Sequence, residues 1–147
     1  MNDKALDGIR VLDLSRVLAG PYCAAILGDM GADVIKIEIP GRGDDSRYFN
    51  AFANGESAYF MNFNRNKRGM TLNLKSPEGK ALFLKLVKKA DVVVENFRPG
   101  TMDKMGLGYE TLREHNPGII YAAVSGYGAT GRYHQRPGYD ITVQAMS

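Results

Sequence analysis

The run Val94–Gly100 (VENFRPG) carries three neighbouring side chains that could hold a flat, charged ligand. Asn96 can donate and accept hydrogen bonds, Phe97 offers a face on which a planar ring stacks, and Arg98 offers a cation for a phosphate. The Pro-Gly pair that follows them turns the chain back. Because the preceding residues are apolar and branched, we predict a ligand-binding loop at the end of a strand.

The run Arg136–Asp140 (RPGYD) is a second cluster, with a cation, a rigid turn, an aromatic ring and a carboxylate. The Asp140 carboxylate could belong to a site, or it could cap a helix formed by the apolar residues that follow. The residues alone leave both interpretations open.

Other reactive side chains form no clear catalytic pattern. The basic group at 65–68 (RNKR) fits either a phosphate clamp or a solvated turn. Cys23 is expected to pack as a small apolar residue in a helix. Neither His115 nor His134 has a second ligand at a spacing that suits a metal, so we expect no metal site.

The elements that must position these residues alternate between strand and helix. A continuous apolar run predicts a strand, Pro marks a helix start, and Gly marks a helix end. A mainly parallel α/β sheet with helices on both faces is therefore expected, with ligands at the carboxyl ends of the strands. We predict strands at 9–14, 33–38, 70–74, 91–95 and 119–124, helices at 21–30, 77–90 and 109–116, a loop at 41–55, an ambiguous segment at 59–64 and a last apolar segment at 139–147.

The size and charge of the chain exclude some classes of protein. The 147 residues suit one domain, and 19 basic against 16 acidic residues give a net charge of +3, which is too balanced for a nucleic-acid binder. The 17 glycines indicate many tight turns and ligand loops. No apolar run is long enough for a bilayer span, and one cysteine without a signal-peptide pattern predicts a cytoplasmic protein.

The first strand is followed by the loop Ser15–Pro21 (SRVLAGP), where a dinucleotide-binding fold carries GxGxxG. Gly20 is the one glycine in that loop, so the loop does not match the motif. Although Glu38 ends the second predicted strand, where a ribose-binding acid would lie, we expect no NAD site.

These motifs, in this order, resemble those of the class III CoA-transferases, the family of formyl-CoA transferase, carnitine CoA-transferase and α-methylacyl-CoA racemase. The resemblance implies a Rossmann-like domain that binds coenzyme A or acyl-CoA and acts on a small carboxylic acid. Complete chains of the family are longer and form interlocked homodimers, so residues 1–147 are expected to be the N-terminal part of that domain. The matching stretches are 6–13, 19–21, 27–38, 41–47, 64–68, 90–100, 105–109 and 136–147.

The resemblance also implies which residues contact CoA. Arg98, Lys104 and Lys75 would supply cations for its phosphates, and Phe97 or Tyr139 a face for its adenine. The full implied set is Val17, Leu18, Leu72, Asn73, Leu74, Lys75, Asn96, Phe97, Arg98, Lys104, Arg136, Pro137, Gly138 and Tyr139.

In transferases of the family an aspartate attacks the acyl-CoA thioester and then carries CoA as an aspartyl thioester. That nucleophile matches a motif beyond Ser147, whereas Asp140 matches a supporting carboxylate, so we expect this chain alone to be inactive. Racemases place a histidine before that carboxylate; here the residue is Tyr139, which disfavours racemisation. Formyl-CoA transferases place a glutamine where this chain has Leu18, which disfavours formyl or oxalate chemistry without excluding it.

Two other functions remain open. The chain could be a CoA-binding fragment or one subunit of a split enzyme, with no chemistry of its own. It could also be a nucleotide-binding regulator, which the lack of a glycine-rich phosphate motif disfavours.

Overall fold

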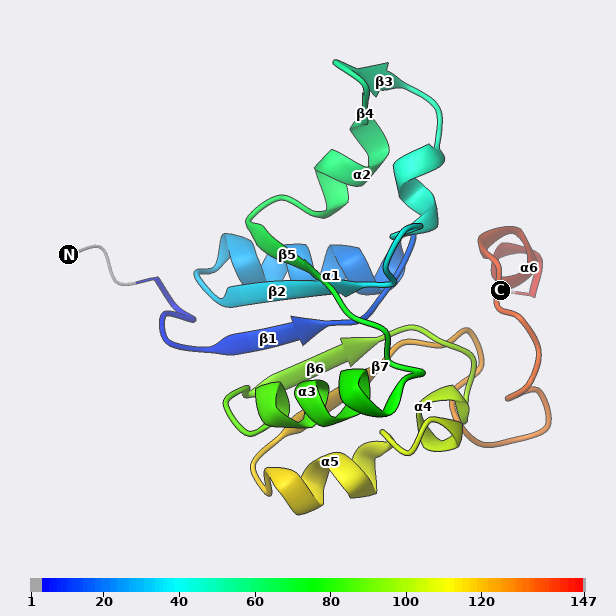
Figure 1. The fold of residues 1–147 in the computed structure, drawn as a ribbon. Helices are drawn as coiled ribbons and strands as arrows, with labels where there is room; N and C mark the ends of the chain where they lie inside the picture. Colours follow the sequence, from blue (N-terminus) through cyan, green and yellow to red (C-terminus); the bar gives the residue numbers. More distant parts are fainter. Residues whose placement is uncertain (1–3, 147) are drawn as a thin grey trace.

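The computed structural model of the protein describes residues 4–146. The main sheet has five strands in the order β5-β2-β1-β6-β7, and every neighbouring pair is parallel (Figure 1). The predicted mainly parallel α/β sheet is therefore confirmed. The strands are β1 (Arg10–Asp13), β2 (Asp33–Glu38), β5 (Lys67–Thr71), β6 (Val92–Glu95) and β7 (Ile120–Ala123).

The connections between the strands carry the helices. In the described residues, no helix has both the length and the hydropathy that crossing a membrane requires. The helical segments are α1 (Ala19–Asp29), the 3₁₀ turn η1 (Asp45–Tyr48), α2 (Ala58–Phe63), α3 (Pro77–Val87), α4 (Thr101–Lys104), α5 (Tyr109–His115) and α6 (Asp140–Met146).

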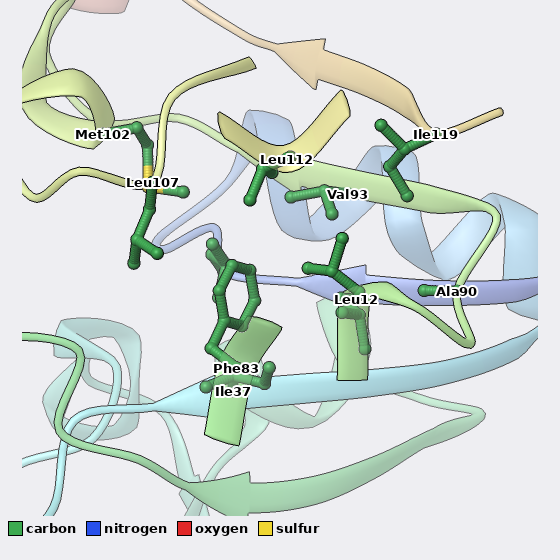
Figure 2. Packing of buried hydrophobic residues seen from close by; sticks show 11 residues of the cluster. Leu12, Ile37, Phe83, Ala90, Val93, Met102, Leu107, Leu112 and Ile119 are labelled. Carbon is green, nitrogen blue, oxygen red and sulfur yellow. The ribbon is translucent and has the colours of Figure 1, made fainter. Parts of the chain in front are cut away.

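Alternation along β1 divides the core into two clusters. Val11 belongs to the cluster that contains Ala24 of α1, whereas Leu12 belongs to the cluster that contains Phe83 of α3. Because successive side chains of a strand point to opposite faces, α1 and α3 cover opposite faces of the sheet. The fully buried Phe83 ring lies among side chains that include Leu12 and Leu112 (Figure 2).

Helix α3 begins where its sequence predicts. The Ser76 hydroxyl accepts a hydrogen bond from the Gly79 amide at 3.0 Å, and Pro77 takes the first helical position, where its missing N–H costs nothing. The helix ends at Val87, three residues before the predicted end.

Several boundaries differ from the prediction. Strand β5 covers 67–71 rather than 70–74, because Leu72 and Leu74 pack against the core from the segment after the strand and so extend the apolar alternation. Helix α1 begins two residues before Pro21, which is tolerated within a first turn. The four-residue helix α4 was not expected.

The predicted loop at 41–55 and the ambiguous segment after it contain short elements. Beyond η1, the strands β3 (Phe52–Ala53) and β4 (Glu56–Ser57) pair as an antiparallel hairpin that stands away from the main sheet (Figure 1). Helix α2 resolves the ambiguous segment, and the Ser57 hydroxyl caps it by accepting from the Phe60 amide at 3.2 Å.

The last segment forms a separate feature. Figure 1 shows α6 at a distance from the sheet, after a long connection that follows β7. Its residues 140–146 are exposed. Ser147, which ends the predicted apolar segment, lies outside the described residues.

Candidate functional site

A cavity of about 310 Å³ lies at the carboxyl ends of the strands. It is lined by residues 14–16 after β1, residues 37–39 at the end of β2, residues 72–75 after β5, and Phe97 after β6. The strand order reverses between β1 and β6, because the chain builds outward from β1 through β2 to β5 and then crosses back to β6. Parallel α/β sheets bind ligands at such a reversal point, and the volume is in the range of small-molecule pockets.

The loop after β1 is held to the loop after β6 by one side chain. The Asn96 Oδ1 accepts from the Arg16 amide at 2.8 Å, and the Asn96 Nδ2 donates to the Arg16 carbonyl at 2.7 Å. The Arg16 guanidinium lies over the Phe97 ring, 5.6 Å from its centroid. The amide of Asn96 is thus used within the protein, and it fixes the two loops that meet at the reversal point.

A buried ion pair lies beneath the same loop. The Lys36 Nζ is 2.9 Å from the Asp44 Oδ2 and donates to the Ser15 carbonyl at 2.9 Å. The two side chains are 3% and 0% exposed. Burial raises the pKa of the Asp44 carboxyl, but the charge of Lys36 and the bonds from Ser46 outweigh it, so the pKa lies below its usual value and the carboxylate stays ionised.

A second buried pair joins β5 to β1. The Lys67 Nζ donates to the Asp13 Oδ2, the Pro21 carbonyl and the Asn64 Oδ1, at 2.8, 2.8 and 2.9 Å. An ammonium has three donors, and all three are used here. Burial lowers the pKa of Lys67, and the neighbouring Asp13 carboxylate opposes that shift.

The three cations of the basic group at 65–68 have carboxylate partners, which disfavours a phosphate clamp. Lys67 is enclosed, Arg65 pairs with Asp29 of α1, and Arg68 pairs with Asp33 at the first position of β2. The alternative of a solvated turn fits Arg65 and Arg68, whose side chains are 41% and 66% exposed, but it does not fit the enclosed Lys67. The sequence did not show that these partners, distant in the chain, lie beside the group.

Glu38 ends β2 and lines the cavity. Its carboxylate accepts from the Arg47 Nε at 2.8 Å and Nη2 at 2.7 Å, and from the Asp44 amide at 2.8 Å. Burial raises the pKa of Glu38, but these hydrogen bonds and the Arg47 charge bring it below the usual value. The position that binds a ribose in dinucleotide folds is thus already occupied by a guanidinium.

Glu95 has a different environment at the end of β6. It is 7% exposed, accepts from the Phe97 amide at 2.6 Å, and accepts from the Tyr121 hydroxyl at 3.1 Å. Burial raises the pKa of this carboxyl more than these bonds lower it. Its contact with Phe97 fixes the backbone of the residue whose ring lines the cavity.

The structure brings only part of the predicted CoA-contact set into the cavity. Leu72, Asn73, Leu74, Lys75 and Phe97 line it. The other predicted residues near these loops lie outside the lining: Val17 is half-buried, whereas Leu18, Arg98 and Lys104 are exposed. For each of them contact with CoA stays a prediction.

The predicted cluster at 136–140 does not line the cavity. Arg136 lies over the Tyr133 ring, 4.4 Å from its centroid, while Pro137, Gly138 and Tyr139 are exposed. Gly138 is needed for another reason: its backbone packs against Gly126 so closely that a Cβ on either residue would collide.

Asp140 is the first residue of α6, and its carboxylate accepts from the Gln144 side chain at 2.8 Å. This hydrogen bond links positions four residues apart in the helix. A role in a site stays a prediction.

The sequence analysis did not single out four residues at or beneath the cavity: Ser15, Arg16, Lys36 and Asp44. The signal for Lys36 was present, because a lysine inside the apolar run DVIKIE must find a partner when the strand is buried on both faces. Asp44 lies in the glycine-rich stretch after that strand. Nothing in the sequence pattern pairs the two residues.

A parallel sheet with this strand order and a cavity at the reversal point defines the Rossmann-like class of α/β domains. The sequence matches CoA-transferase family III over residues 6–147. The chain belongs to this family.

Characterised relatives agree with that assignment. A mouse succinyl-CoA:glutarate CoA-transferase is 50% identical over 145 residues, which cover 98% of this chain and 33% of that protein. An acetyl-CoA:oxalate CoA-transferase from Acetobacter aceti is 51% identical over 96% of this chain and 36% of that protein. The β subunit of a succinyl-CoA–L-malate CoA-transferase from Chloroflexus aurantiacus is 49% identical over 96% of this chain and 35% of that protein.

The fold has a close match among solved structures. A CAIB/BAIF family protein from Brucella suis superposes with a TM-score of 0.92 at 45% identity, over 99% of this chain and 39% of that chain. The chain therefore spans about a third of the length of the relatives it matches.

Proposed function

We propose that this chain supplies the CoA-binding part of an enzyme that moves CoA from an acyl-CoA to a small carboxylic acid. The observation that carries the proposal is the cavity at the strand reversal, which is lined by residues 72–75 and Phe97. Five residues implied by the family resemblance thus come together from two separate loops. Membership of the CoA-transferase family supports the same conclusion.

The side chains around the cavity suit the parts of CoA. The Phe97 ring provides an aromatic face, with the Arg16 guanidinium already above it. Lys75 lines the cavity, and the exposed Arg98 follows Phe97 directly, so both cations are available for phosphates. Asn96 joins the two loops and Glu95 accepts from the Phe97 amide, and no ion pair among the described residues involves Lys75 or Arg98.

The proposed chemistry follows the family resemblance. An aspartate carboxylate attacks the thioester carbonyl, which releases CoA thiolate and leaves a mixed anhydride. The thiolate then attacks the aspartyl carbonyl and releases the donor acid, so that CoA is held as an aspartyl thioester. The acceptor carboxylate then attacks the aspartyl thioester and displaces the CoA thiolate. The thiolate attacks the acyl carbonyl of the acceptor, which leaves as its CoA ester and restores the aspartate carboxylate.

We infer that the nucleophilic aspartate does not lie in this chain. Relatives are about three times as long, and the resemblance assigns Asp140 only a supporting role. The 147-residue chain is therefore expected to bind CoA without transferring it. Turnover by a verified 147-residue polypeptide that Asp140→Asn abolishes would contradict this.

The binding proposal is tested by calorimetry with CoA, ATP and NAD on the purified chain. CoA is expected to bind more tightly than either of the others. Arg98→Gln should weaken CoA binding about tenfold, a loss of about 1.4 kcal/mol, because it removes one phosphate cation. Arg68→Gln is the matched control, since that cation pairs with Asp33 at the opposite end of the strands.

Two results would contradict the binding proposal. The first is a chain that prefers ATP or NAD to CoA, which would favour a nucleotide-binding regulator. The second is equal CoA affinity in the two arginine variants, since the cation would then have no role.

A second candidate function is one subunit of an enzyme assembled from different chains. The β subunit from Chloroflexus aurantiacus among the relatives supports it. CoA transfer that begins only when a partner chain is added would favour this reading. Activity of a longer polypeptide that contains these residues would favour a single-chain enzyme.

A further inference from the structure

Val17, in the loop after β1, has a backbone conformation that its side chain disfavours. Its φ is +70°, and of the four non-glycine residues with positive φ among residues 4–146, Val17 is the β-branched one. Such a residue stays in this region only when its surroundings hold it there. The loop therefore needs a specific partner that fixes its shape.

That partner is the Asp44 carboxylate. The Val17 amide donates to Asp44, 3.1 Å from Oδ1 and 3.3 Å from Oδ2. The same carboxylate pairs with Lys36, whose Nζ holds the Ser15 carbonyl. Together with Asn96, which holds both backbone groups of Arg16, these contacts fix three consecutive residues of the loop.

Asp44 lies where this contact can affect the cavity. It follows β2 in the chain and is 0% exposed, and Ser15 and Arg16 of the held loop line the cavity with it. The carboxylate already accepts from the Val17 amide, the Ser46 amide and hydroxyl, and Lys36. Its effect on a ligand would therefore pass through the loop.

We propose that Asp44 is a positioning residue that, through the Val17 amide, holds residues 15–17 in the shape that binds acyl-CoA. This rests on the proposed function of the cavity. The positioned element is the backbone: without the acceptor, Val17 returns to negative φ and the loop leaves its place beside Phe97.

The test compares two variants in one background. Lys36→Met removes the buried cation, so that Asp44 can be replaced without leaving an unpaired charge. In that background Asp44→Ala removes the acceptor of the Val17 amide, whereas Asp44→Asn keeps an acceptor oxygen. Ser46→Ala is the control, because the Ser46 hydroxyl donates to Asp44 rather than to a residue of the loop.

The proposal predicts a difference between the two double variants. CoA should bind at least tenfold more weakly to D44A/K36M than to D44N/K36M, and S46A should stay within about twofold of the unaltered chain. The thermal midpoint is measured for each, with binding recorded well below the lowest one. Equal CoA affinity of the two folded double variants would overturn the proposal. The acceptor oxygen at position 44 would then have no effect on CoA binding.

Amide hydrogen exchange separates this proposal from the proposed function. The Val17 amide should exchange at least tenfold faster in D44A/K36M than in D44N/K36M, while Leu12 in β1 keeps its protection. If the unaltered chain binds no CoA, the proposed function fails and the positioning of the loop is still decided by this measurement. Equal exchange at Val17 in both variants would overturn it.

Discussion

Gly20, in the first turn of α1, is a position where the structure leaves almost no room for a side chain. A Cβ added there would collide with the Ser15 Cβ, lie 2.6 Å from the Ser15 Oγ and lie 3.4 Å from the Asn96 Cβ. The helix thus begins in direct contact with both loops of the reversal point. Gly20→Ala should push the start of α1 away from them.

The loss of stability in Gly20→Ala depends on whether Ser15 can move away from the added methyl group. Ser15 is fixed, because its amide and hydroxyl both donate to the buried Asp13 carboxylate. The overlap should therefore cost about 3 kcal/mol, the upper end of the range for overpacking. The higher helix propensity of alanine offsets about 1 kcal/mol of this cost. A net loss of about 2 kcal/mol in the free energy of unfolding should lower the thermal midpoint by roughly 4–8 °C.

The assay is thermal unfolding followed by circular dichroism, with CoA calorimetry on the same samples. Gly28→Ala in the same helix is the matched control: its Cβ would meet Asn66 at 3.3 Å, a small overlap that the gain in helix propensity offsets. The control should unfold within about 2 °C of the unaltered chain. Equal midpoints for the two variants would refute the reasoning, because the contact with Ser15 would then carry no strain.

Three further substitutions probe the core and the buried charges. Phe83→Ala should lower the free energy of unfolding by about 3–5 kcal/mol in urea titrations, because the ring is fully buried; a loss under about 1 kcal/mol would contradict that packing. Lys67→Met should cost about 3–5 kcal/mol by leaving Asp13 unpaired, against at most about 1 kcal/mol for Arg68→Gln at an exposed pair, and equal costs would refute the enclosure of Lys67. Glu95→Gln should match the unaltered chain at acidic pH, where the carboxyl is neutral in both states. As the pH rises through the raised folded-state pKa of Glu95, the unaltered chain loses stability that the glutamine variant keeps. The difference in thermal midpoint between the two proteins should therefore grow from pH 4 to pH 8. A difference that stays constant would contradict the burial of this carboxyl.

The sequence predicted the elements whose signals are local. Strand β2 has the predicted ends because a branched apolar run fills it, and α3 begins at Pro77 because Ser76 supplies a cap. Helix α4 was missed, since four residues are too few for a periodic pattern, and its N-cap Gly100, with a φ of +78°, was assigned only to a turn.

The candidate site was predicted in part for a similar reason. The VENFRPG run identified the loop after β6, and the resemblance identified residues 72–75, which line the cavity. The contacts that hold the loop after β1 could not be predicted, because Asn96 is 80 residues from Arg16 and Asp44 is 27 residues from Val17. Pairings at that separation depend on sheet order, which no local pattern encodes.

The strand order has a consequence for how the molecule assembles. Strand β6 pairs with β1 across about 80 residues, so closing that pairing carries a large chain-entropy cost during folding. A nascent chain that has reached the end of β5 already contains three neighbouring strands of the sheet, but it lacks the other wall of the cavity. The two loops that Asn96 joins come together only after β6 has been synthesised and docked, which makes ligand binding a late property of the folding chain.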